Sequence, residues 1–239
     1  MFKKIIIAVA IATLALGQVA KAQNVQLFWD FGKDRNYLTT TFEMFKPDKF
    51  GDTFWFIDHY FSDKATYNLG QAGATGGSYF EIERGFNFWQ NSALKDLSAH
   101  IEYDGTTWGW GIACFGAKYC FHNDDFSSQL TLYLMYDLHL GTSSADVPVK
   151  FSAVLGLSDI FGVKGLSFKG FLDVWGNNSI FASGNTGKFS ILTEPQLWFN
   201  LGSFFDNHLD IGSEVELSYN FAGHEGFMIN PCAGLRWTF

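Results

Sequence analysis

The sequence predicts an all-β protein: a single antiparallel transmembrane β-barrel of about 12 strands, with both termini on the periplasmic side. Apolar and polar residues alternate along most of the chain, which is the period of a β-strand with two different faces. Several alternating segments reach the roughly 9 to 11 residues that a tilted strand needs to cross a bilayer. Charged residues make up only 17% of the chain, whereas a typical soluble domain has about 25%.

The last segment, residues 227–239, shows the alternation most clearly. Its predicted outer face is apolar and consists of Phe227, Ile229, Ala233, Leu235, Trp237 and Phe239. Its predicted inner face consists of Asn230, Gly234, Arg236 and Thr238. The length and the final aromatic residues suit a membrane strand that ends in an aromatic girdle, and a buried strand of a soluble sandwich is the alternative. The ending at Phe239 also resembles the signal that the outer-membrane insertion machinery reads, so that machinery is an expected partner.

The N-terminus has the pattern of a secretory signal peptide. Lys3 and Lys4 precede an apolar run over residues 5–16, and the small residues around Lys21 supply a cleavage site after Ala22. We therefore divide the chain into a signal peptide, residues 1–22, and an outer-membrane β-barrel, residues 23–239. No other stretch approaches the ~18 apolar residues of a membrane helix, so we expect the protein in the outer membrane of a Gram-negative bacterium.

Charge and cysteine content narrow the possible functions. Cleavage of the signal peptide would leave 13 basic residues against 24 acidic ones, a formal charge of −11. An acidic exported protein is a poor binder of nucleic acid. The three cysteines are an odd number, which argues against a disulfide framework, although one local bridge between Cys114 and Cys120 across a turn stays open.

The alternation divides the mature chain into twelve segments, each predicted as one strand. They span residues 24–32, 37–45, 53–61, 79–88, 97–104, 107–115, 127–138, 147–157, 166–175, 188–201, 209–220 and 227–239. An even number of strands returns both termini to one side of the membrane. Short connections such as 46–51 and 202–208 are assigned to one side, and the long connections 62–77 and 176–187 to the other.

Turn signals and irregular faces refine these strands. Residues 46–49, which contain Pro47, are expected to break the second strand, and Asp104-Gly105 is expected to form a tight hairpin turn. Arg84 falls on the apolar face of its strand. A bulge near Gly85 would shift the alternation by one residue and move Arg84 to the polar face.

Two segments have faces that are harder to assign. Residues 53–61 are largely apolar on both faces, so the inward face of this strand stays open. In residues 107–115, we expect the bulky Trp108, Trp110 and Ile112 to point outward and the small residues between them to leave the inner face open.

Barrel closure decides which faces point inward. A β protein spans a bilayer only as a closed barrel, and a lysine or arginine facing the membrane midplane costs about 2 to 4 kcal/mol. The polar faces must therefore line a lumen, which at twelve strands is expected to be narrow, wet and partly aromatic. The predicted lumen-lining residues are Phe28, Asp30, Tyr37, Glu43, Glu81, Glu83, His100, Glu102, Tyr133, Lys169, Phe171, Asp173, Glu194, Gln196, Trp198, Glu214, Glu216 and Arg236.

Several motifs across the mature chain carry a resemblance to a known family. They are Asn24-Val25-Gln26-Leu27 with Asp30-Phe31-Gly32, residues 40–49, Tyr79-Phe80-Glu81-Ile82-Glu83-Arg84, Glu194-Pro195-Gln196-Leu197-Trp198, and residues 234–239. With these motifs the chain resembles the Tsx-like nucleoside-specific channel-forming outer-membrane proteins, in particular a poorly characterised branch of small exported barrels. The resemblance implies a monomeric twelve-stranded barrel whose lumen passes nucleosides.

The expected function is therefore passive uptake of small, mostly uncharged solutes through the outer membrane. Nucleosides are the leading candidates, because inner aromatic rings can stack on a base while inner amides bond to its polar groups, and short sugars are the runner-up. The acidic excess among the lumen residues predicts a weak cation preference. A structural or adhesive barrel without transport is the alternative, and membrane lipid is the surrounding partner in either case.

Enzyme, metal and cofactor sites find little support in the sequence. Ser98, His100 and Glu102 share a strand face and resemble parts of a catalytic triad, but same-face neighbours stand roughly 7 Å apart, too far for a hydrogen bond between nucleophile and base. A lipid-modifying enzyme is the less favoured alternative. The histidines show no metal-ligand spacing, and His122 with its neighbours Asp124 and Asp125 is better explained as a solvated turn. We expect no catalytic residues, no metal and no cofactor.

Overall fold

The computed structural model describes residues 23–33, 35–61, 76–107, 109–141 and 145–239. The predicted signal peptide, most of the predicted long loop 62–77 and the predicted outward residue Trp108 lie outside the described residues. Within the described chain, no helix has the length and apolar character to cross a membrane.

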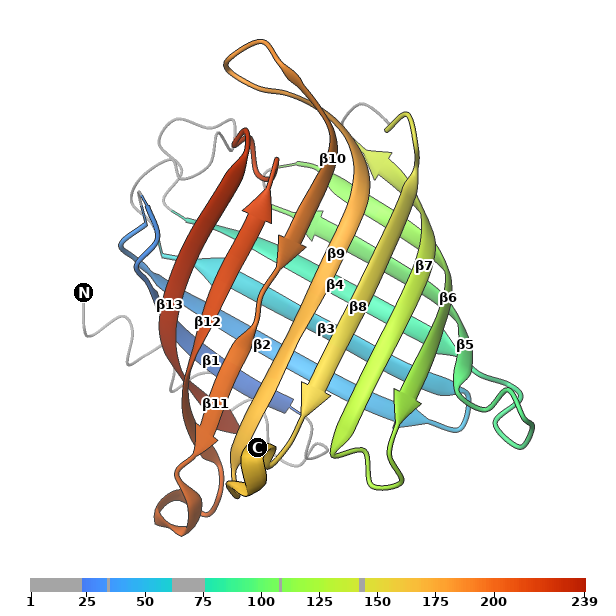
Figure 1. Ribbon diagram of the computed structural model, residues 1–239, viewed down its shortest axis with the longest axis vertical. Coiled ribbons are helices and arrows are strands. Elements are labelled where there is room, and N and C mark those ends of the chain that lie inside the picture. Colours follow the sequence, from blue (N-terminus) through green and yellow to red (C-terminus); the bar gives the residue numbers. More distant parts are fainter. Residues whose placement is uncertain (1–22, 34, 62–75, 108, 142–144) are drawn as a thin grey trace.

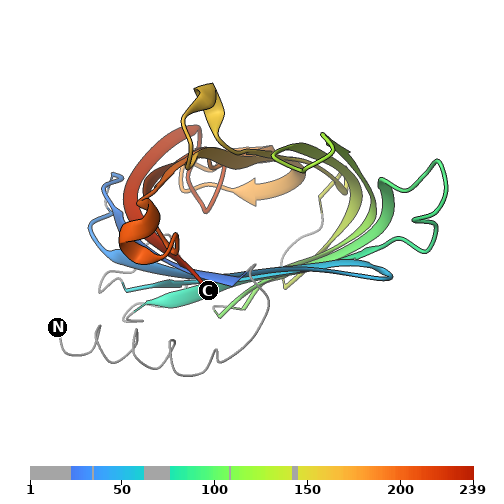
Figure 2. The ribbon, with the colours of Figure 1, turned by 90° about the horizontal axis from the view of Figure 1, so that it is seen from below.

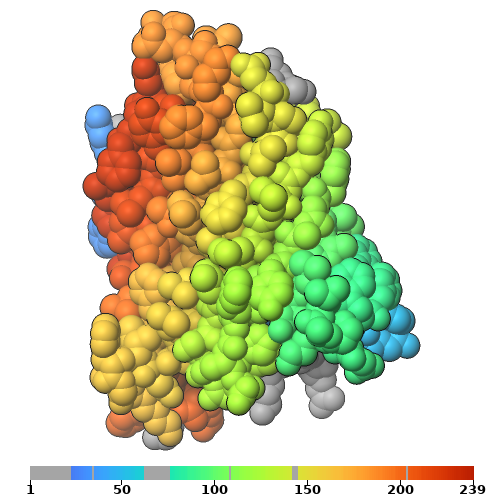
Figure 3. Space-filling model, turned by 45° about the vertical axis from the view of Figure 1, so that its right-hand side comes forward, coloured from blue at the N-terminus to red at the C-terminus, as the bar shows by residue number. Residues whose placement is uncertain are grey.

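The strands form one closed antiparallel barrel (Figures 1 and 2). The strands are β1 (Gln23–Asp30), β2 (Leu38–Asp48), β3 (Gly51–Tyr60), β4 (Gly77–Phe86), β5 (Leu97–Thr106), β6 (Gly111–His122), β7 (Ser128–Leu140), β8 (Val149–Leu157), β9 (Leu166–Ile180), β10 (Thr186–Thr193), β11 (Gln196–Asn200), β12 (Leu209–Tyr219) and β13 (Phe227–Thr238). Short 3₁₀ turns, η1 (Ile160–Gly162) and η2 (Gly202–Phe205), lie in two connections. Each strand pairs with its neighbours in the sequence, as the ordered colour bands of Figure 3 show on one outer face.

The segments β10 and β11 are two parts of one strand, so the described barrel has twelve strands, as predicted. Both parts pair with β9 and β12, and the register is the same on either side of the interruption: Thr193 lies opposite Leu172, and Gln196 lies opposite Lys169. The interruption falls at Pro195, which has no N–H to donate to a neighbouring strand.

The first and last strands close the barrel. β1 pairs with β13 from Asn24 opposite Thr238 to Asp30 opposite Cys232, and the Phe239 amide donates a hydrogen bond to the Gln23 carbonyl at 3.0 Å. The two ends of the barrel domain therefore lie side by side at one end of the barrel, as the even strand number predicts.

Period-two alternation sets the inner and outer faces of the strands. In β13, Phe227 is 61% exposed on the outer face, whereas Asn230 is 2% exposed on the inner face. The same division holds in β1, β5, β7, β8 and β12, where the polar face predicted to point inward is the buried one. The apolar outer band needs lipid, because water would not favour so many exposed aliphatic and aromatic side chains.

Three predicted turns are wrong. β2 continues through Pro47, which lies opposite Asp52, so the predicted break at 46–49 does not occur. β5 continues through Asp104 and Gly105, and Gly105 pairs with Gly111 of β6. The hairpin turn therefore follows β5 instead of falling at Asp104 and Gly105. β9 runs to Ile180, so most of the predicted loop 176–187 is paired strand. In each case cross-strand pairing overrides a local turn signal.

The predicted bulge at Gly85 is wrong as well. The pairing of β4 with β3 and β5 continues through Gly85 without a shift. Arg84 stays on the outer face near the end of the barrel, where it donates hydrogen bonds to Asp48 at 2.8 Å and to Thr53 at 3.0 Å. Gly85 faces inward, and an added Cβ would lie 2.6 Å from a carboxylate oxygen of Asp52, so the glycine makes room for an inner side chain.

The predicted faces of residues 107–115 are also wrong, because Ile112 and Cys114 are buried on the inner face of β6. β6 extends to His122 and therefore includes Lys118 on the same face as Ile112. A lysine facing lipid costs about 2 to 4 kcal/mol, so Lys118 turns this face inward.

The cysteines form no bridge. Cys114, Cys120 and Cys232 are free. Cys114 and Cys120 lie on one face of the same continuous strand, about 20 Å apart at the rise of an extended chain. The local bridge that the sequence left open is therefore excluded.

Candidate functional site

The interior of the barrel contains a cavity of about 1960 Å³. Its lining includes Gln90 and His122 near the end that carries the termini, and Asn178 and Gly223 at the opposite end. The cavity therefore extends along the barrel from one set of connections to the other.

Sixteen of the eighteen predicted lumen residues line this cavity. They are Phe28, Asp30, Tyr37, Glu43, Glu81, Glu83, Glu102, Tyr133, Lys169, Phe171, Asp173, Glu194, Gln196, Glu214, Glu216 and Arg236. His100 and Trp198 point inward but do not reach the cavity surface, since they are only 1% and 0% exposed. Both lie beneath other inner side chains.

Trp198 is covered by a cluster at the terminal end of the barrel. Its ring centroid lies 5.6 Å from that of Phe28, and the Arg236 guanidinium lies 4.6 Å above it. Its Nε1 donates a hydrogen bond to Gln196 at 2.8 Å, and Arg236 is held by Asp210 at 2.9 Å. A solute in the lumen therefore meets Phe28 and Arg236 rather than the face of Trp198.

The wall of the cavity is acidic. Among the described lining residues, fifteen are aspartate or glutamate and six are lysine or arginine. Two of the basic residues, Lys150 and Arg35, each lie within a group of carboxylates.

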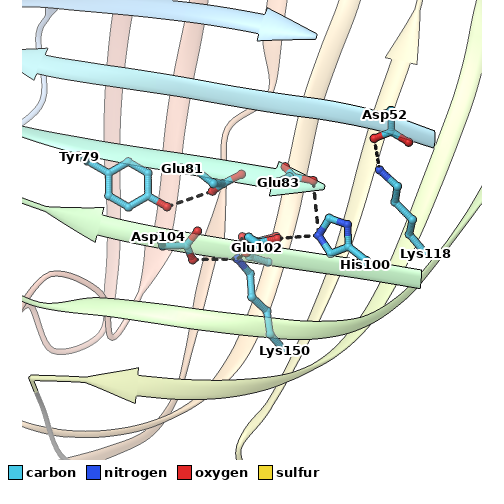
Figure 4. Close-up of polar contacts among 10 residues, drawn as sticks. Asp52, Tyr79, Glu81, Glu83, His100, Glu102, Asp104, Lys118 and Lys150 are labelled. Carbon is cyan, nitrogen blue, oxygen red and sulfur yellow. Dashed lines mark hydrogen bonds and ion pairs between the residues drawn. The ribbon is translucent and has the colours of Figure 1, made fainter. Parts of the chain in front are cut away.

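One group, the Lys150 cluster, consists of Lys150, Glu102, Asp104 and Asp173. Figure 4 shows the first three of these residues. The Lys150 Nζ atom lies 2.6 Å from Glu102, 3.2 Å from Asp173 and 3.4 Å from Asp104. Three carboxylates from β5 and β9 thus meet at the ammonium group of Lys150 on β8, a residue that is only 5% exposed. Three carboxylates surround one ammonium, so the cluster has an excess of acidic groups.

The other group, the Arg35 cluster, consists of Arg35, Asp30, Glu216, Thr39 and Asn230. Arg35 lies 2.7 Å from Glu216 and 3.4 Å from Asp30. Thr39 donates to Asp30 at 2.7 Å, and Asn230 donates to Glu216 at 2.8 Å. The sequence prediction missed Arg35 because this residue lies in the turn after β1. A turn has no alternation of polar and apolar residues from which an inward direction could be predicted.

A second omission is the aromatic ladder formed by Phe54, Phe56 and Tyr79. The ring centroids of Phe54 and Phe56 lie 5.9 Å apart, and those of Phe56 and Tyr79 lie 5.6 Å apart. All three line the cavity. Asp52 and Asp58 share the face of Phe54 and Phe56, and this pair of carboxylates was the signal that could have assigned the inward face of the segment.

Comparisons with known proteins give a family and a fold. The family model described as "Domain of unknown function (DUF5020)" matches residues 22–239, and no curated protein matches the sequence. The outer membrane phospholipase OMPLA of Salmonella typhi, solved as a dimer with bound calcium, has 8% identity and a TM-score of 0.52, covering 95% of this chain and 96% of that chain.

Two further solved structures have lower TM-scores. The outer membrane channel DcaP of Acinetobacter baumannii has 11% identity and a TM-score of 0.40, covering 85% of this chain and 63% of that chain. OccK5 (OpdH) of Pseudomonas aeruginosa has 8% identity and a TM-score of 0.40, and the match covers 91% of this chain and 97% of that chain. At 8% identity, the match to OMPLA supports the barrel fold alone and says nothing of the activity.

Proposed function

The chain belongs to the family described as "Domain of unknown function (DUF5020)", and because that description assigns no activity, we propose from the barrel itself that this protein is a channel for passive uptake of small solutes. Its place would be the outer membrane of a Gram-negative bacterium. The observation that carries the proposal is the cavity of about 1960 Å³, whose lining reaches the connections at both ends of the barrel.

The acidic wall supports a weak preference for cations. Fifteen acidic and six basic residues line the described cavity, and carboxylates in a confined pore hold a negative potential. We expect reversal potentials in a salt gradient to indicate a cation-to-anion permeability ratio above one. The ratio should fall as salt rises, since the Debye length is about 8 Å at 0.15 M; an anion-selective pore would contradict this assignment.

The lining also supports flat, mostly uncharged solutes, with nucleosides as the first candidates. The aromatic ladder offers three rings in sequence, and a base stacked on an aromatic side chain gains about 1 to 3 kcal/mol. Gln26, Gln129 and Gln196 line the same cavity and can bond to neutral polar groups. Short sugars are the second candidates, because sugars also lie on aromatic faces.

Uptake into proteoliposomes tests this proposal. The purified barrel would be compared for adenosine, thymidine, glucose and an amino acid of similar size. We expect the nucleosides to enter fastest at low concentration, and Phe56→Ala to reduce their uptake about fivefold or more, the loss expected for one stacking contact. The matched control is Phe115→Ala, which removes a ring that is 45% exposed on the outer face.

The outcomes separate three functions. Equal entry of all four solutes, unchanged by Phe56→Ala, would leave a general diffusion pore and remove the nucleoside assignment. No entry of any solute and no conductance would favour a structural or adhesive barrel.

Lipid hydrolysis is the enzymatic alternative, and we propose that the protein is not an enzyme of this kind. Ser98 and His100 lie on the inner face of β5, away from lipid, and among the described residues His100 contacts Glu83 and Glu102 rather than a serine. Release of fatty acid from phospholipid vesicles by the purified barrel, lost in Ser98→Ala, would contradict this view.

A further inference from the structure

His100 is the most enclosed ionisable side chain of the β5 wall. It is 1% exposed, and the ring of Tyr133 packs edge-on against it with centroids 4.9 Å apart. Within the described chain, two carboxylates lie within ion-pair distance of the imidazole, and both approach the same ring nitrogen. Nε2 lies 3.2 Å from Glu102 Oε2 and 3.5 Å from Glu83 Oε2 (Figure 4).

These three side chains, which we call the His100 triplet, have the spacing of a metal site. Their ligand atoms all lie within 4.8 Å of one another. Two ligands bound to one zinc ion at 2.0–2.2 Å in tetrahedral geometry lie about 3.4 Å apart, and the two distances from Nε2 fall on either side of that value. An ion between these atoms would therefore require only small movements of the side chains.

The histidine can present a lone pair to a cation. Nδ1 of His100 is buried and has no hydrogen-bond partner in the structure. Without an ion, the two carboxylates beside Nε2 favour a proton on that nitrogen, and a bound cation would take the place of this proton. With the proton on Nδ1, Nε2 and the two carboxylates would face one another as three electron-pair donors.

The basic residues nearby do not occupy the triplet. Lys150 takes the other oxygen of Glu102, Oε1, at 2.6 Å, and otherwise contacts Asp104 and Asp173. Lys118 is paired with Asp52 at 2.5 Å. The oxygens that face His100 are therefore left without an ammonium partner.

Charge in the surrounding wall also favours a cation. The triplet and its neighbours on β4, β5 and β9 bring together Glu81, Glu83, Glu102, Asp104 and Asp173, with Lys150 as their ammonium partner and the Lys118–Asp52 pair beside them. Asp104 keeps one oxygen, Oδ1, without a hydrogen-bond partner. Burying several carboxylates against one ammonium is costly, and a divalent cation would offset much of this repulsion.

We propose that the His100 triplet binds one divalent transition-metal ion of the zinc type, with Glu83, His100 and Glu102 as ligands. An imidazole nitrogen favours zinc and its neighbours in the first transition row over magnesium and calcium, which prefer oxygen alone. Glu83 and Glu102 line the cavity, so the ion would arrive from the lumen. This inference is independent of the proposed transport of solutes.

A second group of possible ligands, Glu102, Asp104 and Cys114, lies beside the first. Lys150 already contacts both of its carboxylates, so a cation there would have to displace the ammonium group. The His100 triplet has no such competitor, and for this reason we place the ion at His100.

Equilibrium dialysis of the purified, chelator-treated barrel against Zn²⁺, followed by mass-spectrometric metal analysis, tests the site. We expect one Zn²⁺ per barrel, and at least tenfold weaker binding in both His100→Ala and Glu83→Gln. Glu83→Gln keeps the size of the side chain, and an unheated detergent gel confirms that each variant is folded. Co²⁺ in place of Zn²⁺ should give visible absorption bands that His100→Ala abolishes.

The matched control is His139→Ala. His139 also lies on an inner face beside a carboxylate, Asp137 at 3.4 Å, and within the described residues it forms an ion pair with that one carboxylate. This variant should bind Zn²⁺ as the wild type does. The proposal is overturned if the wild type retains no Zn²⁺, if the folded His100 and Glu83 variants bind it equally well, or if the His139 variant loses it to the same extent. Displacement of Zn²⁺ by an equal concentration of Ca²⁺ would overturn the assignment to a transition metal.

Discussion

At the scale of single residues, the burial of an ion pair decides how much it contributes to the stability of the folded barrel. Lys150 and Lys188 each lie 2.6 Å from a carboxylate, but Lys150 is buried in the wall and the Lys188 side chain is 62% exposed. Lys150→Met leaves three carboxylates around an uncharged group, and breaking a buried pair costs about 3 to 5 kcal/mol. Lys188→Met, the matched control, should cost about 0 to 1 kcal/mol. Guanidinium unfolding, followed by tryptophan fluorescence, measures the free energy of unfolding of both variants. Equal losses of this free energy would contradict the buried role of Lys150.

At the scale of elements, the interruption between β10 and β11 is a local weakness in the wall. The amide of Val215 donates to the Pro195 carbonyl at 3.1 Å, but Pro195 has no N–H to return a second bond. Pro195→Val supplies this donor without changing the register, so we expect slower amide exchange in peptides covering residues 190–198. Peptides from β7, on another part of the wall, are the internal control. Exchange that is equally fast in both proteins would show that the missing bond does not weaken this strand.

At the scale of the whole molecule, closure depends on the pairing of the two terminal strands. Phe239 donates its amide to Gln23 and follows directly on β13, so it lies at the seam between β1 and β13. We expect the barrel to migrate differently on unheated and boiled detergent gels, since fully paired strands resist detergent. Removal of Phe239 should reduce the folded band in cell membranes, whereas Phe239→Tyr, which keeps an aromatic end, should not. Normal assembly of the truncated chain would remove the proposed role of Phe239 in insertion.

The sequence by itself determined the barrel, its twelve strands and most of its faces. These properties follow from alternation within single segments, because lipid requires apolar side chains on one face and paired backbone groups throughout. The assignment failed where a segment was too short to include its charged residue, as in 107–115 without Lys118, or was apolar on both faces, as in 53–61.

Only the tertiary structure decided which inner side chains meet. The alternation of polar and apolar residues predicts that Glu102 and Lys150 both point inward. Their 2.6 Å contact, between residues 48 apart in the sequence, depends in addition on the register of the strands between them. Arg35 reaches Glu216, 181 residues away, only because β1 and β13 close the barrel. The same closure covers Trp198 with Phe28 and Arg236. The register between β4 and β5 brings Glu83 and Glu102 to one nitrogen of His100. Alternation is a local property of the chain, whereas register and closure are set by all strands together.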